Sequence, residues 1–399
     1  MSGNIMLDGN GAAAEALRLA RVRVVSACPV TPQSPLAEKL AEFINHGRLE
    51  ARLIRVESEQ AALSCALGAQ LTGVRACTAT SSGTLASVHE LCGVAAGLRV
   101  PLVMPVVNRS VAAPWHFWCD HQEAMAERDS GWIQFHAANC QEVVDLLLIC
   151  YRAAEDPQVR LPAMVCLDGF FLSHTTEAVF APDQGEVDNY LPPYQNASVR
   201  LWPDEPMFVN SICGLDDFSE IRYQGCLGLE RAPEAIIRAT EAFQASFGRL
   251  YGLVEAYGLD DAEAVLVGLG SMTGTMKYVV DNYRAEGHRV GMLRLISYRP
   301  FPAEEVARLL APIEHIGVVD RSASPGNMSG PLTADVRAVL SVHAPGKSVS
   351  SFMAGLGGRN VGLGTVARAF DYLLEGRASG KTVWLDTDTA SALTLRPAV

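Results

Sequence analysis

Three short segments of the chain place polar side chains directly after an apolar run, where they could do chemistry. The first is Cys28-Pro-Val-Thr31-Pro, which follows the β-branched run 22–27. Its two prolines restrict the main chain that carries the Thr31 hydroxyl, so this group could be aimed at a substrate. A purely structural turn explains the two prolines equally well.

The other two segments carry charge. Glu57 and Glu59 stand between an apolar run and a stretch of small residues, where a carboxylate could exchange a proton or could only complement the dipole of a helix start. Asn108 and Arg109 end the apolar run 100–107. An arginine there could bind a substrate carboxylate through two hydrogen bonds, or could form a structural ion pair.

An alternation of strands and helices must position these segments. We expect strands, with helices between them, at 22–27, 52–57, 75–81, 101–107 and 161–171. Ser34 is the expected cap of the first of these helices, and Asn139 is the expected cap of the last. Such alternation favours a parallel sheet covered on both faces, whose carboxyl edge is the usual ligand-binding edge.

The same patterns divide the chain into three parts. Residues 1–172 form the first expected α/β domain. From about residue 173 to 231 the composition shifts to Pro, Asp, Asn and Tyr, and residues 173–257 are expected to form an irregular connection with a helix that wraps a neighbour or links domains. Strands and helices alternate again in 258–399. The predicted fold class is therefore α/β, with two parallel-sheet domains.

Composition and charge narrow the function classes. The 399-residue chain has 44 acidic and 32 basic residues and a net charge of -12, which argues against nucleic acid as a partner. Its apolar runs are too short to span a membrane, and Asp8, Glu15 and Arg18 interrupt any secretory signal, so a cytoplasmic location is expected. Ten cysteines without a CxxC pair predict buried thiols and no metal site.

A glycine-rich turn at 268–274 invites comparison with dinucleotide sites. In Gly268-Leu-Gly270-Ser-Met-Thr-Gly274, however, the third glycine comes one residue late for GxGxxG. The next expected strand also lacks the acidic residue that would bind a ribose. A tight turn between a strand and a helix is therefore the preferred interpretation.

Several segments, taken in order, resemble one family over nearly the whole chain. The family is the alpha subunit of the thiamine-diphosphate-dependent 2-oxoacid:ferredoxin oxidoreductases. The segments that carry the resemblance are CPVTPQSPLAEKL, RVESEQAAL, CTATSS, NRSVAAPWHFWCDHQEAMAERDSGWIQ, LPAMVCLDGFFLSH, SYRPFP and AGLGGR.

The resemblance implies a domain that binds the pyrimidine ring of thiamine diphosphate, followed by a transketolase-C-like domain. It assigns the diphosphate and its Mg2+ to a beta subunit, and iron-sulfur clusters to partner subunits that include ferredoxin-like gamma and delta chains. Consistent with half a site, no GDG motif followed by a suitably spaced Asn occurs here. The implied electron acceptor is ferredoxin or a flavin subunit linked to NAD.

The resemblance also assigns roles at the three segments. Glu59 matches the glutamate that hydrogen-bonds the pyrimidine nitrogen of the cofactor, Thr31 matches the threonine whose hydroxyl meets the substrate, and Arg109 matches the arginine that receives the substrate carboxylate. Asn108 is a weaker neighbour. The implied reaction is oxidative decarboxylation of a 2-oxo acid, with the acyl group passed to coenzyme A. Apolar side chains suit a dry pocket for this step, and the aromatic rings that could form it, or could pack against a subunit, are Trp115, Phe117 and Trp118.

Two departures from the family pattern bear on specificity. The family loop usually reads YPITP, so Cys28 stands where a tyrosine is expected and the volume of a phenol ring is freed near Thr31. We therefore favour an aryl substrate, phenylglyoxylate converted to benzoyl-CoA, with pyruvate as the alternative. The second departure, Ser324 to Gly330 in place of SFGxGGP, leaves open whether this loop contacts coenzyme A or a subunit.

Two other classes of protein remain as alternatives. A non-catalytic assembly subunit is disfavoured because Thr31, Glu59 and Arg109 are all kept. A stand-alone transketolase-like enzyme is disfavoured because no diphosphate-binding domain is encoded. A subunit that supplies half a site is expected to form large, mostly apolar interfaces with its partners.

Overall fold

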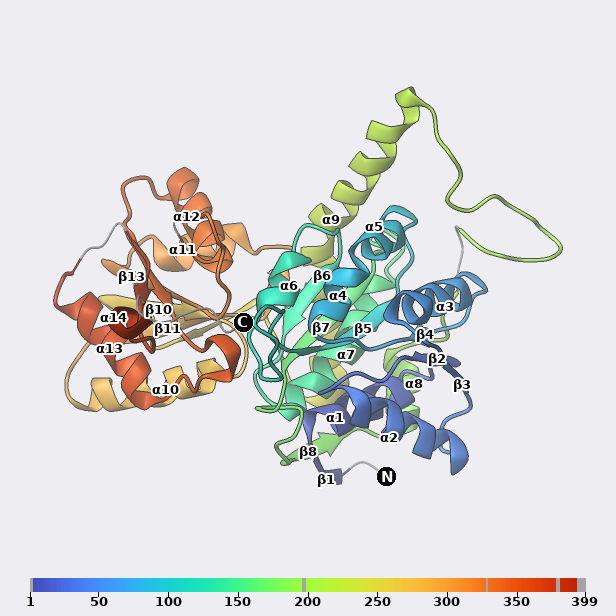
Figure 1. The fold of residues 1–399 in the computed structure, drawn as a ribbon, viewed down its shortest axis with the longest axis horizontal. Helices are drawn as coiled ribbons and strands as arrows, with labels where there is room; N and C mark the ends of the chain where they lie inside the picture. Colours follow the sequence, from blue (N-terminus) through green and yellow to red (C-terminus); the bar gives the residue numbers. More distant parts are fainter. Residues whose placement is uncertain (1–2, 196–198, 328, 378–380, 393–399) are drawn as a thin grey trace.

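The computed structural model describes residues 3–195, 199–327, 329–377 and 381–392. The chain forms two α/β units side by side, one from its first half and one from its last third (Figure 1). Each unit is built on a mainly parallel sheet with helices on both faces, which confirms the predicted fold class. Within these residues, no helix combines the length and the apolarity needed to cross a membrane.

The first unit has one continuous sheet. Two hydrogen-bonded groups, in the orders β3-β2-β4 and β12-β6-β7-β5, are joined by a parallel bridge between Thr80 and Val106. Only the pairing of β12 with β6 is antiparallel. The strands are β2 (Val24–Ala27), β3 (Arg52–Arg55), β4 (Ala76–Cys77), β5 (Val103–Asn108), β6 (Ile133–His136), β7 (Ala163–Asp168) and β12 (Ser297–Arg299).

Helix α1 (Gly9–Leu19) precedes these strands, and six helices of the described chain lie between β2 and β7. They are α2 (Ser34–Asn45), α3 (Glu59–Leu71), α4 (Gly83–Ser87), α5 (His89–Gly97), α6 (Gln122–Ala126) and α7 (Cys140–Ala154). The cap prediction for α7 is confirmed, since the Asn139 side chain accepts a hydrogen bond from the Glu142 N–H at 2.9 Å. The prediction for α2 is wrong by one residue, because Ser34 is already helical and Gln33 takes the cap position. The Gln33 amide instead donates to the Cys28 carbonyl at 2.8 Å.

The connection between the units holds more regular structure than its composition predicts. Strand β8 (Glu177–Ala181) pairs with the N-terminal strand β1 (Gly3–Leu7), and the helices α8 (Gln184–Tyr190) and α9 (Leu215–Phe247) follow. A short strand whose partner lies 170 residues away leaves no local signal, which explains why it was not expected. The C-terminal half of α9 packs on the first unit, while its N-terminal half projects away from it (Figure 1).

The second unit has a six-stranded sheet in the order β15-β14-β13-β10-β11-β9, in which only β9 is antiparallel. Its strands are β9 (Val254–Tyr257), β10 (Ala264–Gly268), β11 (Val290–Leu295), β13 (His315–Asp320), β14 (Val349–Met353) and β15 (Val383–Trp384). Its helices are α10 (Met272–Ala285), α11 (Ala303–Leu310), α12 (Pro331–His343), α13 (Leu363–Leu374) and α14 (Thr389–Ala392), with a 3-10 turn at Leu356–Gly358.

Candidate active site

The five predicted site residues all follow strands of the first sheet. Cys28 and Thr31 follow β2, Glu59 follows β3, and Asn108 and Arg109 lie at the end of β5. Because these strands are parallel, the residues lie at the carboxyl edge of the sheet.

Arg109 and Thr31 are in direct contact. The Arg109 Nη1 donates to the Thr31 carbonyl at 2.9 Å, and its Nε donates to the His116 carbonyl at 2.8 Å. The guanidinium also lies 4.9 Å from the ring centre of Phe117 and 5.4 Å from that of Trp115. No acceptor for Nη2 is found in the described part of the chain, so this nitrogen remains available to an anion.

Glu59 and Cys28 form a second contact. Glu59 is the first residue of α3, whose cap Ser58 accepts a hydrogen bond from the Ala61 N–H at 3.2 Å. Burial raises the pKa of the Cys28 thiol, and the adjacent Glu59 carboxylate raises it further through its charge and a hydrogen bond. Among the described residues, no lysine or arginine pairs with Glu59, which leaves this half-buried carboxylate open to a ligand.

The Asn108 side chain is less accessible than expected of a residue that could contact the substrate. It is buried, and with the amide nitrogen turned inward it donates to the carbonyls of Val106 and Leu167 at 3.3 Å. The adjoining turn requires glycine, because a β-carbon at Gly169 would collide with the Asn108 carbonyl and lie 2.9 Å from Pro32. The loops after β5 and β7 therefore meet main chain against main chain, and the Pro32 ring of the loop after β2 packs beside them.

Glu123 is a residue of this site that the sequence did not single out. Its Oε1 accepts a hydrogen bond from the Arg109 main-chain N–H at 2.6 Å, and its Oε2 has no partner in the described residues. Burial raises the pKa of this carboxyl well above its ordinary value, and the charge of Asp120 adds to the shift. Glu123 lies in the segment 111–137, which has no clean periodicity, so no pattern marked it.

A buried ionic network behind the site was also missed. Asp168, at the end of β7, accepts hydrogen bonds from His121 Nε2 at 2.8 Å, Arg321 Nη1 at 2.9 Å and the Ser271 N–H at 3.0 Å. Burial alone would raise the pKa of Asp168, but the charges of Arg321 and His121 and its hydrogen bonds hold it well below its ordinary value. Arg321 follows β13 and Ser271 follows β10, so the network joins the two units.

The same network bears on the glycine-rich turn at 268–274. Gly270 has a φ of +66°, and a β-carbon there would lie 3.2 Å from the Asp168 carboxylate. The N–H at the start of α10, that of Ser271, is bonded to Asp168. An aspartate of this chain thus takes the place that a phosphate would take in a dinucleotide site, which favours the structural interpretation of the turn.

The loop 109–121, which contains Trp115 and Trp118, is held by the second unit, while its aromatic rings remain partly exposed. His116 hydrogen-bonds the Gly357 carbonyl at 2.7 Å, and the Gly358 N–H donates to the Cys119 carbonyl at 2.6 Å. The rings of Trp115 and Phe117 lie against Arg109 and that of Trp118 lies against Phe170, and each of the three is at least 42% exposed. They form an apolar rim that remains partly exposed in the described chain.

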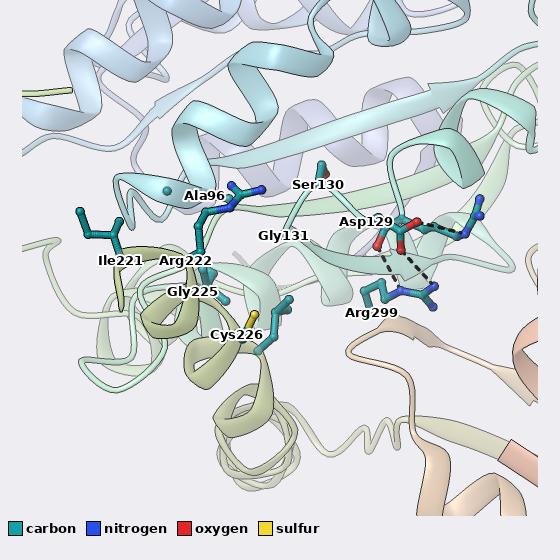
Figure 2. A pocket seen from close by; sticks show the side chains of 13 residues that line it. Ala96, Asp129, Ser130, Gly131, Ile221, Arg222, Gly225, Cys226 and Arg299 are labelled. Carbon is teal, nitrogen blue, oxygen red and sulfur yellow. Dashed lines mark hydrogen bonds and ion pairs between the residues drawn. The ribbon is translucent and has the colours of Figure 1, made fainter. Parts of the chain in front are cut away.

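At least four clefts in the described chain lie away from these residues, and two of them are relevant here. One, of about 320 Å³, lies between α9 and the loop before β6 and contains none of the five predicted residues (Figure 2). The other, of about 610 Å³, is lined by part of the loop from Ser324 to Gly330 together with Trp384. Met328 of that loop lies outside the described residues.

Comparison with known proteins gives family matches over both units. Residues 15–241 match the family described as pyruvate flavodoxin/ferredoxin oxidoreductase, thiamine diphosphate-binding. Residues 262–366 match the family described as pyruvate:ferredoxin oxidoreductase core domain II.

Curated relatives match over almost their full length. The pyruvate synthase subunit PorA of Methanocaldococcus jannaschii is 42% identical over 382 residues, which are 95% of this chain and 97% of the relative. PorA of Thermotoga maritima is 40% identical over 93% of this chain and 95% of its own. The ketoisovalerate oxidoreductase subunit VorA of Pyrococcus furiosus is 40% identical over 94% of this chain and 95% of its own.

Solved structures share the fold at low identity. The 2-oxoglutarate:ferredoxin oxidoreductase from Magnetococcus marinus, solved with 2-oxoglutarate, coenzyme A and succinyl-CoA bound, aligns with a TM-score of 0.73 at 17% identity over 93% of this chain. This chain spans 65% of that longer chain. A split-gene transketolase in an inactive beta4 tetramer aligns with a TM-score of 0.50 at 13% identity, covering 92% of this chain and 99% of that one.

Proposed function

Because this chain belongs to the family of alpha subunits of the 2-oxoacid:ferredoxin oxidoreductases, we propose that it supplies half of a thiamine diphosphate site that oxidatively decarboxylates pyruvate and passes the acyl group to coenzyme A. The observation that carries the proposal is the position of Thr31, Glu59 and Arg109 at one sheet edge, where Glu59 has no basic partner and the Arg109 Nη2 has no acceptor among the described residues. The proposed enzyme works only with its partner subunits.

Pyruvate replaces the aryl acid as the proposed substrate. The aryl preference rested on the volume freed at Cys28, and the relatives do not support it, since they are named for pyruvate and ketoisovalerate. The structure suggests why the freed volume is a weak argument. The Cys28 thiol lies against Glu59, and aromatic rings already stack on Arg109 near Thr31. A small or branched aliphatic 2-oxo acid suits such a site better than a phenyl ring.

The residues present fit the pyrimidine half of the cofactor. When bound, thiamine diphosphate supplies the carbon nucleophile and the electron sink for decarboxylation. Glu59, half-buried at the start of α3, would hydrogen-bond the pyrimidine N1' and hold the proton at that nitrogen. A carboxylate with no basic partner in the described chain is suited to this task, because no ion pair already neutralises its charge.

Arg109 and Thr31 would hold the substrate. The Nη2 of Arg109 would donate to one oxygen of the 2-oxo acid carboxylate, while Nε and Nη1 keep the guanidinium fixed against main-chain carbonyls. The exposed Thr31 side chain would hydrogen-bond a second substrate oxygen. The rim of Trp115, Phe117 and Trp118, once covered by a partner subunit, would exclude water from the pocket.

The other components of the proposed enzyme belong to other chains. A beta subunit would hold the diphosphate and its Mg2+, and iron-sulfur subunits would carry electrons to ferredoxin or to a flavin subunit. The full-length matches to relatives that are themselves named as subunits support this division.

Steady-state reduction of a viologen dye by the intact complex tests the proposal. Pyruvate, 2-oxoisovalerate and phenylglyoxylate are compared, each with coenzyme A and thiamine diphosphate. We expect kcat/KM for pyruvate to exceed that for phenylglyoxylate by more than about tenfold, on the order of 1.4 kcal/mol of transition-state binding. A preference for phenylglyoxylate would restore the aryl assignment, and no reduction with any 2-oxo acid would indicate a non-catalytic assembly subunit.

A further inference from the structure

The loop that carries Arg109 contains little hydrogen bonding of its own. Residues 109–121 join β5 to α6 without a helix or a strand. The base of the loop is closed by Ser110, whose N–H and hydroxyl donate to the Trp118 carbonyl at 2.9 Å and 2.7 Å. Between these ends, residues 111–117 are exposed or half-buried. An exposed segment of this kind needs contacts from elsewhere to hold its carbonyls and side chains in place.

His116 makes both of the hydrogen bonds found for residues 111–117 in the described part of the chain. Its main-chain carbonyl accepts from the Arg109 Nε at 2.8 Å, and its ring Nε2 bonds the Gly357 carbonyl at 2.7 Å. Because a carbonyl oxygen can only accept, the His116 Nε2 must carry a hydrogen. One residue thus contacts the guanidinium with its main chain and the second unit with its side chain.

The two neighbours of His116 complete the contact with Arg109. The rings of Trp115 and Phe117 pack against each other with their centres 4.3 Å apart. The guanidinium carbon lies 5.4 Å from the ring centre of Trp115 and 4.9 Å from that of Phe117. Three consecutive residues therefore hold the arginine with two rings and one carbonyl, and a displacement of this segment would displace all three contacts.

The turn at Leu356–Gly358 holds the same loop at two further points. The Gly358 N–H donates to the Cys119 carbonyl at 2.6 Å, and the Gly357 N–H donates to the Asp120 carboxylate at 3.2 Å. The turn therefore has a fixed position relative to the loop, and the Gly357 carbonyl is a fixed acceptor for the imidazole.

Only glycine suits this close approach of the turn to the loop. Gly357 has a φ of +59° and Gly358 a φ of +76°, in the left-handed region that disfavours other residues. A β-carbon at Gly358 would also collide with the β-carbon of Trp118. The glycines thus allow the second unit to come within hydrogen-bond distance of His116.

We propose that His116 is a positioning residue, which holds Arg109 from the second unit so that the Arg109 Nη2 is directed at the substrate carboxylate. The inference rests on the proposed function, in which Arg109 receives the 2-oxo acid. The Thr31 carbonyl constrains the guanidinium from within the first unit, and His116 adds a constraint that depends on the second. Affinity for the 2-oxo acid is therefore set partly by a contact between the two units.

Two substitutions of similar length separate the hydrogen bond from the volume of the side chain. Glutamine can donate to the Gly357 carbonyl and methionine cannot. In the intact complex, we expect His116→Met to raise the KM for pyruvate by about threefold to tenfold, the effect of one lost hydrogen bond, with kcat and the KM for coenzyme A changed by less than about twofold. His116→Gln should keep the native KM. A native KM for pyruvate in His116→Met, or an equal rise in both variants, would overturn the proposal.

A double variant tests whether His116 acts through Arg109. Adding His116→Met to Arg109→Ala should lower kcat/KM for pyruvate by less than about a further twofold, since the arginine that His116 supports is already absent. Losses that multiply would show that His116 acts independently of Arg109, which contradicts the proposal.

The same measurements separate this inference from the proposed function. If the native complex reduces no dye with any 2-oxo acid, the proposed function fails and the inference fails with it. If the native complex is active and Arg109→Ala raises the KM for pyruvate while His116→Met does not, only the inference fails.

The glycine turn gives an independent readout from the second unit. Gly358→Ala forces the turn away from Trp118 and should raise the KM for pyruvate as His116→Met does. Gly376→Ala is the matched control, because Gly376 has a φ of +64° and a β-carbon there would meet no atom of the described chain within 4 Å. Similar thermal unfolding midpoints of the two variants would exclude a general loss of stability as the cause. Equal KM values for pyruvate in the two glycine variants would overturn the role of the second unit.

Discussion

Arg109 and Thr31, 78 residues apart in the chain, are joined by a hydrogen bond of 2.9 Å from the Arg109 Nη1 to the Thr31 carbonyl. The bond ties the loop after β2 to the loop after β5. It also fixes the orientation of the guanidinium, because only Nη2 is left for another acceptor. The two residues proposed to hold the substrate thus position each other before any substrate arrives.

Replacing Arg109 should mainly weaken substrate binding. Arg109→Ala removes a charge-assisted hydrogen bond to the carboxylate, worth about 1.5–3 kcal/mol, so kcat/KM for pyruvate should fall by roughly 10- to 100-fold. Arg109→Lys should also lose activity, since lysine cannot hold the Thr31 and His116 carbonyls and the substrate together. Dye reduction by the intact complex measures both, with the exposed Arg308→Lys as control. An unchanged KM in Arg109→Ala would contradict the assigned role.

Glu59→Gln should abolish most of the activity without loss of folding. An amide cannot exchange a proton with the cofactor nitrogen, and loss of such a group costs about 10²- to 10⁴-fold in rate. Glu57→Gln is the matched control, because Glu57 lies two residues earlier and is exposed. If both variants lost activity equally, the role of Glu59 would be refuted.

Cys28→Tyr should narrow the range of substrates. The added ring occupies the space near Thr31, so kcat/KM for 2-oxoisovalerate should fall at least tenfold relative to pyruvate, about the discrimination that a pocket gains from one or two methylene groups. Cys28→Ser removes the thiol without adding volume and should leave this ratio unchanged. Equal ratios in the native enzyme and Cys28→Tyr would mean that residue 28 does not border the substrate.

Glu123→Gln should make the complex more stable at higher pH. The folded state raises the pKa of Glu123, so its neutral form contributes stability fully below the usual carboxyl range and loses it as the pH rises through the folded pKa. The glutamine variant keeps an oxygen for the Arg109 N–H and has no proton to lose. The difference in free energy of unfolding between variant and native protein should therefore grow in favour of the variant above about pH 4.5. A difference that is flat from pH 5 to 9 would show that Glu123 does not titrate in this way.

Asp168→Asn should destabilise the chain at neutral pH. It leaves Arg321 buried without its counter-ion, a change that costs about 3–5 kcal/mol. Because the folded state lowers the pKa of Asp168, its contribution is present above about pH 4 and is lost as the pH falls further through the folded pKa. Urea unfolding at pH 7 and pH 3 measures this. The exposed pair Asp261–Arg284 provides a control, and Asp261→Asn should have a much smaller effect. Equal losses in the two variants would count against the network.

The parts of the fold that depend on local pattern were predictable. The first sheet follows from β-branched runs such as 22–27, and the cap at Asn139 follows from a side chain that bonds its own helix. A helix in the connection was expected, whereas β8 was not, because its partner β1 lies at the other end of the unit.

The residues of the candidate site likewise fall into two groups, those that the sequence pattern marks and those that it does not. Thr31, Glu59 and Arg109 each follow an apolar run, so the sequence marks them and the topology brings them to one edge. Glu123 and Arg321 act through contacts with distant main chain or side chains, and nothing in their neighbouring residues distinguishes them from ordinary surface charges. Their roles can be recognised only in the folded structure, where the two side chains are 0–3% exposed.

Strand β12 follows β11 after a single residue, yet it hydrogen-bonds to β6 in the other sheet. A cut anywhere between the two units would therefore strip an edge strand from one sheet or leave an unpaired edge on the other. Neither half of the polypeptide is a self-sufficient fragment, and limited proteolysis should release no stable piece that ends between residues 258 and 297.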